Sequence, residues 1–207
     1  MKKLFAFLII IGAVVWLTKA KNRERSWEFI EPHLPAPKSS SAHSTAQSYD
    51  GACYLTIDEN WTTTKRGYSF DNMLIDIQVG LKQGRAGVLV LAEPLQNAKY
   101  YDLGKFSSYA SDFTRSKVEG GVIANGPIDV TVGGLKAHQY VIKGRMEDRN
   151  IVILHTSLQG NSSFYQIAAI TTASRLEKEK GSILKVVRSF RETSRANKLI
   201  RPRILKN

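Results

Sequence analysis

Three short turn signals in the second half of the chain narrow the possible folds more than any other feature. They fall at Gly133-Gly134, at residues 147–150 and at residues 160–163, and each separates two apolar stretches. Connections this short join antiparallel strands, because parallel neighbours need a crossover of about a dozen residues or more. The sequence therefore predicts an antiparallel sheet that includes four consecutive strands, at residues 128–132, 135–146, 151–158 and 164–172.

Further strands are predicted upstream of these four. Residues 52–57 form a short apolar stretch that ends at a polar Asp-Glu-Asn run. Apolar and polar side chains alternate from Met73 to Val79, as in a half-buried strand. Residues 88–91 are apolar without interruption, which is typical of a central strand. The total is about six or seven strands.

Two amphipathic helices complete the predicted domain. Asp102 can cap the first by accepting from the free N–H groups of its first turn, and Ser174 forms a capping box with Glu177 for the second. We therefore predict an α+β fold over residues 50–191, a mostly antiparallel sheet sandwiched by helices (α/β/α). The predicted apolar faces are Leu103, Phe106, Tyr109, Ala110 and Phe113 in the first helix, and Leu176, Ile183, Leu184, Val187 and Phe190 in the second.

The N-terminus predicts a signal peptide or membrane anchor at residues 1–20, with an apolar helix. Residues 4–17 are apolar without interruption and follow Lys2 and Lys3. This run suits a secretory signal better than a full span, which needs about 20 residues. The basic residues just beyond it resist export. An uncleaved anchor, with the domain on the periplasmic or extracytoplasmic side of the cell membrane, is favoured over cleavage after Ala20. An inverted anchor and a buried core helix are further alternatives.

Composition separates the domain from its flanks. Residues 21–49 are predicted to be a juxtamembrane segment and a Pro/Ser-rich linker, which has few apolar side chains to offset its ordering entropy. Residues 192–207 form a basic tail. Residues 191–207 carry 6 basic side chains and 1 acidic side chain, and the net charge of the whole chain is +12. Arg201, Arg203 and Lys206 are candidates for contact with anionic lipid, and a solvated, frayed terminus is the alternative. The domain lacks a basic stripe interleaved with aromatics, so nucleic acid is not a predicted partner.

The order of these elements resembles a known family. Its most specific pieces are Asn60-Trp61, Phe164-Tyr165-Gln166 and Ser189-Phe190. The chain is similar over residues 50–191 to the α/β/α sandwich of PsbP, an extrinsic accessory subunit of photosystem II, of bacterial DcrB-type envelope proteins and of a Ran-binding nuclear import factor. The resemblance implies a non-enzymatic binding or assembly module. The lipobox cysteine of lipoprotein members is missing, since Cys53 lies far beyond the apolar segment.

Sequence motifs for catalysis or cofactor binding are absent. The chain has no P-loop, no dinucleotide-binding glycine fingerprint, no zinc-protease motif and no nucleophile elbow. Its single cysteine excludes an intrachain disulfide framework and an all-cysteine metal site. We therefore predict neither an enzyme nor a resident cofactor, and expect Cys53 to face the core as a small apolar group.

Two sets of residues are candidates for binding. Tyr100 and Tyr101 precede the first helix beside Lys99 and Lys105, where exposed aromatic and basic side chains can anchor a protein partner; covering the sheet edge is the alternative role. His138 and His155 fall on neighbouring predicted strands and could bind a metal ion if both face the same side, with ordinary hydrogen-bonded histidines as the alternative.

The sequence supports one main functional hypothesis and one alternative. The main hypothesis is a membrane-tethered or exported envelope accessory protein that binds a protein partner during assembly or transport of a complex. The apolar N-terminus would raise the effective concentration of the domain at the membrane. The alternative is a small-ligand or metal-binding periplasmic domain, released by signal cleavage, that uses a pocket between sheet and helix with His138 and His155.

Overall fold

A computed structural model describes residues 43–64, 69–70, 73–98 and 101–194. The main sheet contains β3 (Trp61–Thr63), β4 (Ser69–Phe70), β5 (Met73–Leu81), β6 (Ala86–Pro94), β7 (Glu119–Val132), β8 (Leu135–Met146), β9 (Arg149–Gln159) and β10 (Ser163–Thr172). A smaller sheet contains β1 (Ser44–Gln47), β2 (Cys53–Ile57) and β11 (Arg191–Glu192). The helices are α3 (Leu103–Ser116) and α4 (Leu176–Arg188), and a 3-10 turn at Ala173–Arg175 precedes α4.

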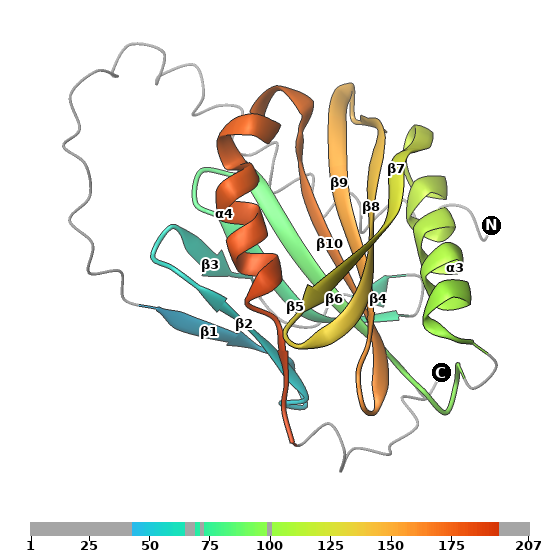
Figure 1. The fold of residues 1–207 in the computed structure, drawn as a ribbon. Coiled ribbons are helices and arrows are strands. Elements are labelled where there is room, and N and C mark those ends of the chain that lie inside the picture. The colour runs from blue at the N-terminus through green and yellow to red at the C-terminus, as the bar shows by residue number, and fades with distance from the viewer. Residues whose placement is uncertain (1–42, 65–68, 71–72, 99–100, 195–207) are drawn as a thin grey trace.

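The main sheet is antiparallel, and its strand order is β3-β5-β6-β10-β9-β8-β7, with β4 paired to β5 off this path. α4 and the small sheet lie on one side of the domain and α3 on the other (Figure 1). Alternate residues of β10 serve the two sides: Tyr165 and Ile167 pack in the cluster that includes α4, whereas Phe164 packs with Phe106 of α3. The predicted α+β class is therefore confirmed for the described residues.

The predicted strand at residues 52–57 exists but belongs to the small sheet. This strand is β2, and it pairs with β1 and β11 rather than with the main sheet. Cys53, Leu55 and Ile57 point inward and join the core between the two sheets. Cys53 is fully buried, as predicted. Pairing to β1 and β11 separates this strand from the main sheet, and apolar patterning alone does not specify such partners.

Part of the predicted linker is folded. Ser44–Gln47 forms β1, an edge strand whose Ala46 is buried in the core beside Leu55. The mainly polar composition of this stretch did not predict a strand, because an edge strand with one buried side chain needs little apolar surface of its own.

β7 is much longer than the predicted strand at 128–132. It begins at Glu119 and runs through Gly120, Gly126 and Pro127, residue types that usually end a strand. Three register shifts against β8 accommodate them. Gly126 has a φ of +110°, and a Cβ there would lie 2.6 Å from the carbonyl oxygen of Gln139, so the close pairing with β8 requires glycine.

The two helix starts differ in how well they follow prediction. Asp102 caps α3 as expected, because its Oδ1 accepts from Lys105 N at 2.7 Å. The predicted capping box of α4 is wrong: Ser174 lies inside the 3-10 turn, Arg175 is the N-cap residue, and no side chain caps the helix. The chain leaves β10 through this turn, which moves the first helical residue past Ser174.

The predicted apolar face of α3 is also partly wrong. Tyr109 is exposed, and the buried residues are Phe106, Ser107, Ala110 and Ser111. The buried face of α3 therefore includes Ser107 and Ser111, and Tyr109 points away from the sheet.

The predicted apolar helix at residues 1–20 and the basic residues Arg201, Arg203 and Lys206 lie outside the described residues. Within the described ranges, neither α3 nor α4 has the length and apolar character that crossing a membrane requires.

Candidate functional site

The outer side of α3 carries a row of aromatic and basic side chains, here called the α3 aromatic face: Tyr101, Lys105, Tyr109, Phe113 and Lys117. The last four are spaced four residues apart, so they follow one stripe along the helix. Tyr101 and Tyr109 are 42% and 60% exposed, and their ring centroids lie 6.1 Å apart at an interplanar angle of 52°. Tyr101 and Lys105 were predicted for such a surface; Lys99 and Tyr100 lie outside the described residues.

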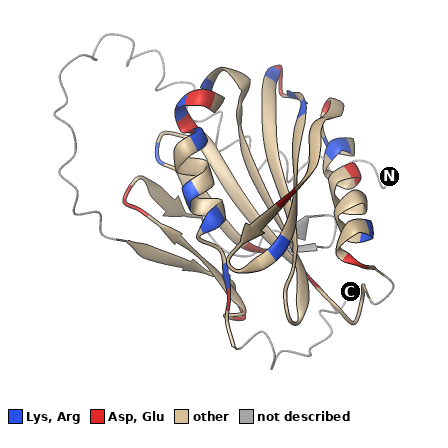
Figure 2. Cartoon of the chain, viewed as in Figure 1, with Lys and Arg blue, Asp and Glu red and all other residues tan. Residues whose placement is uncertain are grey.

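The two lysines of this face have different partners. Lys117 Nζ lies 4.5 Å from the centroid of the Phe113 ring, which is half-buried. Lys105 Nζ lies 3.8 Å from Asp102 Oδ2, and both side chains are largely exposed. Basic and acidic positions both lie along α3, as Figure 2 shows. The face therefore combines aromatic rings with two lysines, Lys105 between the two tyrosines in the row and Lys117 at its end.

α3 is mounted on the sheet by one apolar and one polar contact zone. In the apolar zone, Phe106 stacks on Phe164 with ring centroids 4.4 Å apart and an interplanar angle of 13°, and Ala110 is fully buried. In the polar zone, Ser107 Oγ lies 2.8 Å from His138 Nδ1 and 3.2 Å from the Tyr140 hydroxyl. These contacts hold the aromatic face on a regular helix with a defined orientation.

Ser107, His138 and Asp129 form a hydrogen-bonded chain of the residue types found in hydrolase triads. His138 Nε2 lies 3.2 Å from Asp129 Oδ1, which completes the chain. However, Ser107 has no exposed surface, and its hydroxyl donates to the carbonyl of Gly104 at 2.9 Å. A substrate has no access to this hydroxyl in the observed arrangement, so the chain positions α3 rather than offering a nucleophile.

His138 and His155 lie on the same sheet face, as a shared metal site would require. His138 is directly opposite Ser157, and His155 is opposite Tyr140, so the two histidines are diagonal neighbours under α3. His155 is fully buried; its Nε2 lies 3.4 Å from Gln166 Oε1, and its Nδ1 has no hydrogen-bond partner among the described residues. No group of three or more His, Cys, Asp or Glu side chains in the described ranges could hold a metal ion. The metal site therefore stays a prediction.

Burial of His155 has an electrostatic consequence. Loss of hydration lowers the pKa of its imidazole from 6.5 to about 4, against a smaller opposing effect of the Gln166 hydrogen bond. The ring is therefore neutral at pH 7.

A cavity lies on the other side of the sheet, between α4 and the small sheet, and includes neither His138 nor His155. The sequence contained no signal for it, because its residues come from separate parts of the chain that only the fold brings together. They are His43, Tyr54, Thr56, Asp58, Lys185, Val186, Ser189 and Arg191.

Comparison with models of protein families gave no match, and neither did comparison with curated proteins. Among solved structures, the chain is similar to cyanobacterial PsbP (CyanoP) from Synechocystis sp. PCC 6803, with a TM-score of 0.50, 11% identity, and 77% of this chain and 99% of that chain covered. The domain has a PsbP-like fold. The PsbP-like domain is also similar to LpqN, involved in cell envelope biogenesis of Mycobacterium tuberculosis (TM-score 0.47, 11% identity, 75% and 92% covered). A third similar structure is the immunity protein TplEi of T6SS from Pseudomonas aeruginosa (TM-score 0.39, 11% identity, 84% and 83% covered).

The sequence pieces that carried the resemblance lie at junctions of the PsbP-like domain. Trp61 is buried, as expected of a core aromatic, and its Nε1 donates to Ser182 Oγ of α4 at 2.9 Å. The Tyr165 hydroxyl donates to Glu192 Oε1 at 2.9 Å, and the Tyr165 and Phe190 ring centroids are 5.0 Å apart. These residues explain the fold, since each links α4 or the segment after it to a sheet.

Proposed function

We propose that this protein is a non-enzymatic accessory protein of the cell envelope that binds a protein partner through the α3 aromatic face, in assembly or transport of a larger complex. The observation that carries the proposal is the exposed pair formed by Tyr109 of α3 and Tyr101, which directly precedes the N-cap residue of this helix. Tyrosine rings bury large areas at little cost in side-chain entropy and dominate many protein interfaces. Lys105 and Lys117 belong to the same face, and their positive charge favours a partner surface that combines an apolar groove with acidic residues.

The tether belongs to the same proposal. Residues 1–20 would hold the domain at the cell membrane as a single-pass anchor, with residues 50–191 on the periplasmic or extracytoplasmic side. Arg201, Arg203 and Lys206 would add attraction to anionic lipid of about 1 kcal/mol per basic residue. Release into the periplasm after signal cleavage is the alternative location.

Topology can be tested directly. Cells that express the full chain are fractionated, and intact spheroplasts are treated with protease. A full-length, membrane-bound and protease-accessible protein supports the anchored form, and a shorter soluble protein supports the cleaved form. A domain protected inside the spheroplast contradicts the envelope proposal.

Partner binding is tested by crosslinking in cells followed by purification of the full chain. We expect Tyr101→Ala combined with Tyr109→Ala to abolish the crosslinked complex. Tyr49→Ala is the matched control, because Tyr49 is 77% exposed but does not belong to the α3 aromatic face. A complex that persists in the double variant, or that is lost equally in the control, overturns the assignment of this face.

A further inference from the structure

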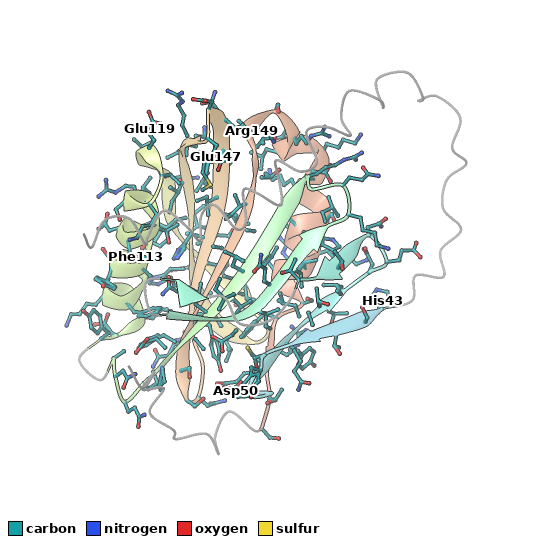
Figure 3. All side chains as sticks on the ribbon, turned by 180° about the vertical axis from the view of Figure 1, so that it is seen from behind. His43, Asp50, Phe113, Glu119, Glu147 and Arg149 are labelled. Carbon is teal, nitrogen blue, oxygen red and sulfur yellow. The ribbon has the colours of Figure 1, made fainter. Side chains whose placement is uncertain are left out.

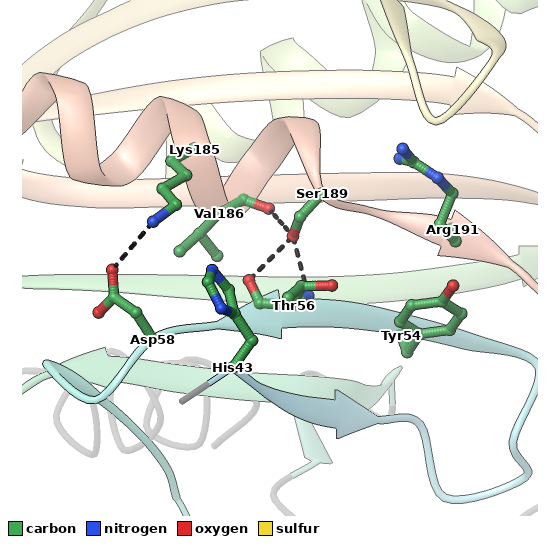
Figure 4. A pocket seen from close by; sticks show the side chains of 8 residues that line it. All are labelled: His43, Tyr54, Thr56, Asp58, Lys185, Val186, Ser189 and Arg191. Atoms are coloured by element: carbon green, nitrogen blue, oxygen red, sulfur yellow. Dashed lines mark hydrogen bonds and ion pairs between the residues drawn. The ribbon is translucent and has the colours of Figure 1, made fainter. Parts of the chain in front are cut away.

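The cavity between α4 and the small sheet has a volume of about 330 Å³. Figure 4 shows its walls: Lys185, Val186 and Ser189 on the α4 side, Tyr54, Thr56 and Asp58 on the strand side, His43 below and Arg191 at one end. Cavities that bind small molecules commonly have volumes of roughly 300–1,000 Å³. The space therefore suits a small metabolite.

Hydrogen bonds connect the two sides of this pocket. Tyr54 and Thr56 alternate with the core residues of β2, so their side chains face away from the core. Ser189 Oγ joins the helix side to the strand side, because it accepts from Thr56 N at 2.9 Å and lies 3.0 Å from Thr56 O. Val186 is buried at the base. The Ser189–Thr56 cross-link holds the two walls together before a ligand binds, and such pre-organisation reduces the entropic cost of binding.

The charged groups of the pocket are mainly cationic. Lys185 and Arg191 carry positive charge, and the exposed His43 is a further nitrogen donor. Asp58 is the single acidic side chain among the described residues that line the pocket, and its Oδ2 lies 3.5 Å from Lys185 Nζ. Asp58 therefore compensates Lys185, and the charge of Arg191 remains unbalanced within the lining. Basic positions also lie along α4 (Figure 2).

The carbonyl groups at the end of α4 are hydrogen-bonded within the protein. The last four carbonyls of the helix, those of residues 185–188, each already accept a hydrogen bond. Ser189 N and Phe190 N supply three of these bonds, to residues 185, 186 and 187. Arg191 Nη1 donates to Arg188 O at 3.0 Å and to Phe190 O at 2.7 Å, which holds the guanidinium at the pocket with Nε and Nη2 as further donors.

We propose that this pocket binds a small polar anion, whose carboxylate or phosphate oxygens accept from Arg191 and Lys185 while the hydroxyls of Tyr54 and Thr56 contact its polar body. Among the described residues that line the pocket, Val186 is the only aliphatic one, so a free metabolite fits better than the acyl chain of a lipid. The pocket and the α3 aromatic face are on opposite sides of the domain, as the labels of His43 and Phe113 show (Figure 3). The two proposals are therefore independent.

The test is a titration of the full chain with inorganic phosphate and, separately, acetate, followed by NMR shifts and calorimetry. We expect saturable binding of one or both anions, with shifts at the lining residues. Arg191→Gln and Lys185→Gln should each weaken binding roughly tenfold or more, because each removes a charge-assisted hydrogen bond. Asp58→Asn should strengthen binding severalfold, since it removes the competing carboxylate and keeps the shape.

Lys178→Gln is the matched control, because it removes one positive charge from an exposed position of α4 outside the pocket. It should leave the affinity within about twofold. If Arg191→Gln fails to fold, Lys185→Gln still tests the pocket, since the Lys185 side chain is 58% exposed and its substitution keeps the Arg191 hydrogen bonds in place. Absence of saturable binding, weakening by Lys178→Gln equal to that of the pocket variants, or weakening by Asp58→Asn overturns the proposal. None of these variants alters the α3 aromatic face, so binding of the protein partner can be measured independently of anion binding.

Discussion

Ser189 Oγ accepts a hydrogen bond from Thr56 N at 2.9 Å and lies 3.0 Å from Thr56 O, although the two residues are 133 positions apart. β11 pairs with β2 only at Cys53 and Tyr54, so the edge of β2 would be unpaired at Thr56. The hydroxyl of Ser189 takes the place of a further strand residue there. One side chain thereby joins the end of α4 to the small sheet and shapes the pocket between them.

Replacement of Ser189 by alanine should destabilise the domain. The change leaves the N–H of the half-buried Thr56 without its acceptor, and loss of such a hydrogen bond costs about 0.5–1.5 kcal/mol. Chemical denaturation should therefore show a free energy of unfolding lower by that amount. Ser116→Ala at the exposed end of α3 removes a hydroxyl that bonds to Phe113 O and should change stability by less than about 0.5 kcal/mol. Equal effects of the two variants would show that the Ser189 contact has no special role.

Glu192 ties the end of the domain to the β9–β10 turn. Its Oε2 accepts from Asn161 N and Nδ2, both at 2.8 Å, and its Oε1 from the Tyr165 hydroxyl at 2.9 Å. Burial, and then the Glu192 carboxylate, raise the pKa of Tyr165 above its usual value, so the phenol stays protonated and donates.

Glu192→Ala should lower the free energy of unfolding by about 2 kcal/mol or more, because several donors lose their acceptor together. Thermal and denaturant unfolding measure the loss. Glu177→Ala is the control, since Glu177 is an exposed acidic residue of α4. A loss no greater than that of the control would mean that solvent replaces the carboxylate at this turn.

His155 should make stability depend on pH between about 4 and 6.5. Its folded-state pKa is lowered from 6.5 to about 4, so in this interval the unfolded chain binds a proton that the folded chain does not. Stability is therefore full above pH 6.5 and falls as the pH decreases toward 4, by about 3 kcal/mol in total. Unfolding measured at pH 7.5 and pH 4.5 should show a smaller difference in His155→Gln than in the wild type. His43→Gln, at an exposed position, should retain the wild-type difference. The prediction fails if His155→Gln retains it too.

Truncation of a side chain should have a large effect on stability on the buried side of α3 and a small effect on its exposed side. Phe106→Ala removes the ring stacked on Phe164 and should cost about 3–5 kcal/mol of stability. Tyr109→Ala removes an exposed ring and should change stability by less than about 0.5 kcal/mol. Denaturant midpoints distinguish the two variants. A large loss in Tyr109→Ala would assign this ring to the folded core instead of a binding surface.

Local features of the sequence predicted much of the fold. Gly133-Gly134 joins β7 to β8, and Asp102 caps α3, because a tight turn and a helix cap depend on residues close in the chain. Tyr101 and Lys105 were predicted as surface residues from their positions near the start of the first helix. Tyr109 was assigned to the buried face, since helical spacing alone does not say which residues face the sheet when two serines share that face.

The sequence by itself determined the α+β class and the antiparallel order of the last strands, because alternation, turn residues and helix periodicity act over a few residues. Only the tertiary structure decided that β2 leaves the main sheet, that Ser189 meets Thr56, and that His43, Asp58 and Arg191 share one pocket. The physical reason is that these relationships depend on strand pairing and helix docking between distant segments. Such contacts are selected by the packing of the whole core, and no local pattern encodes them.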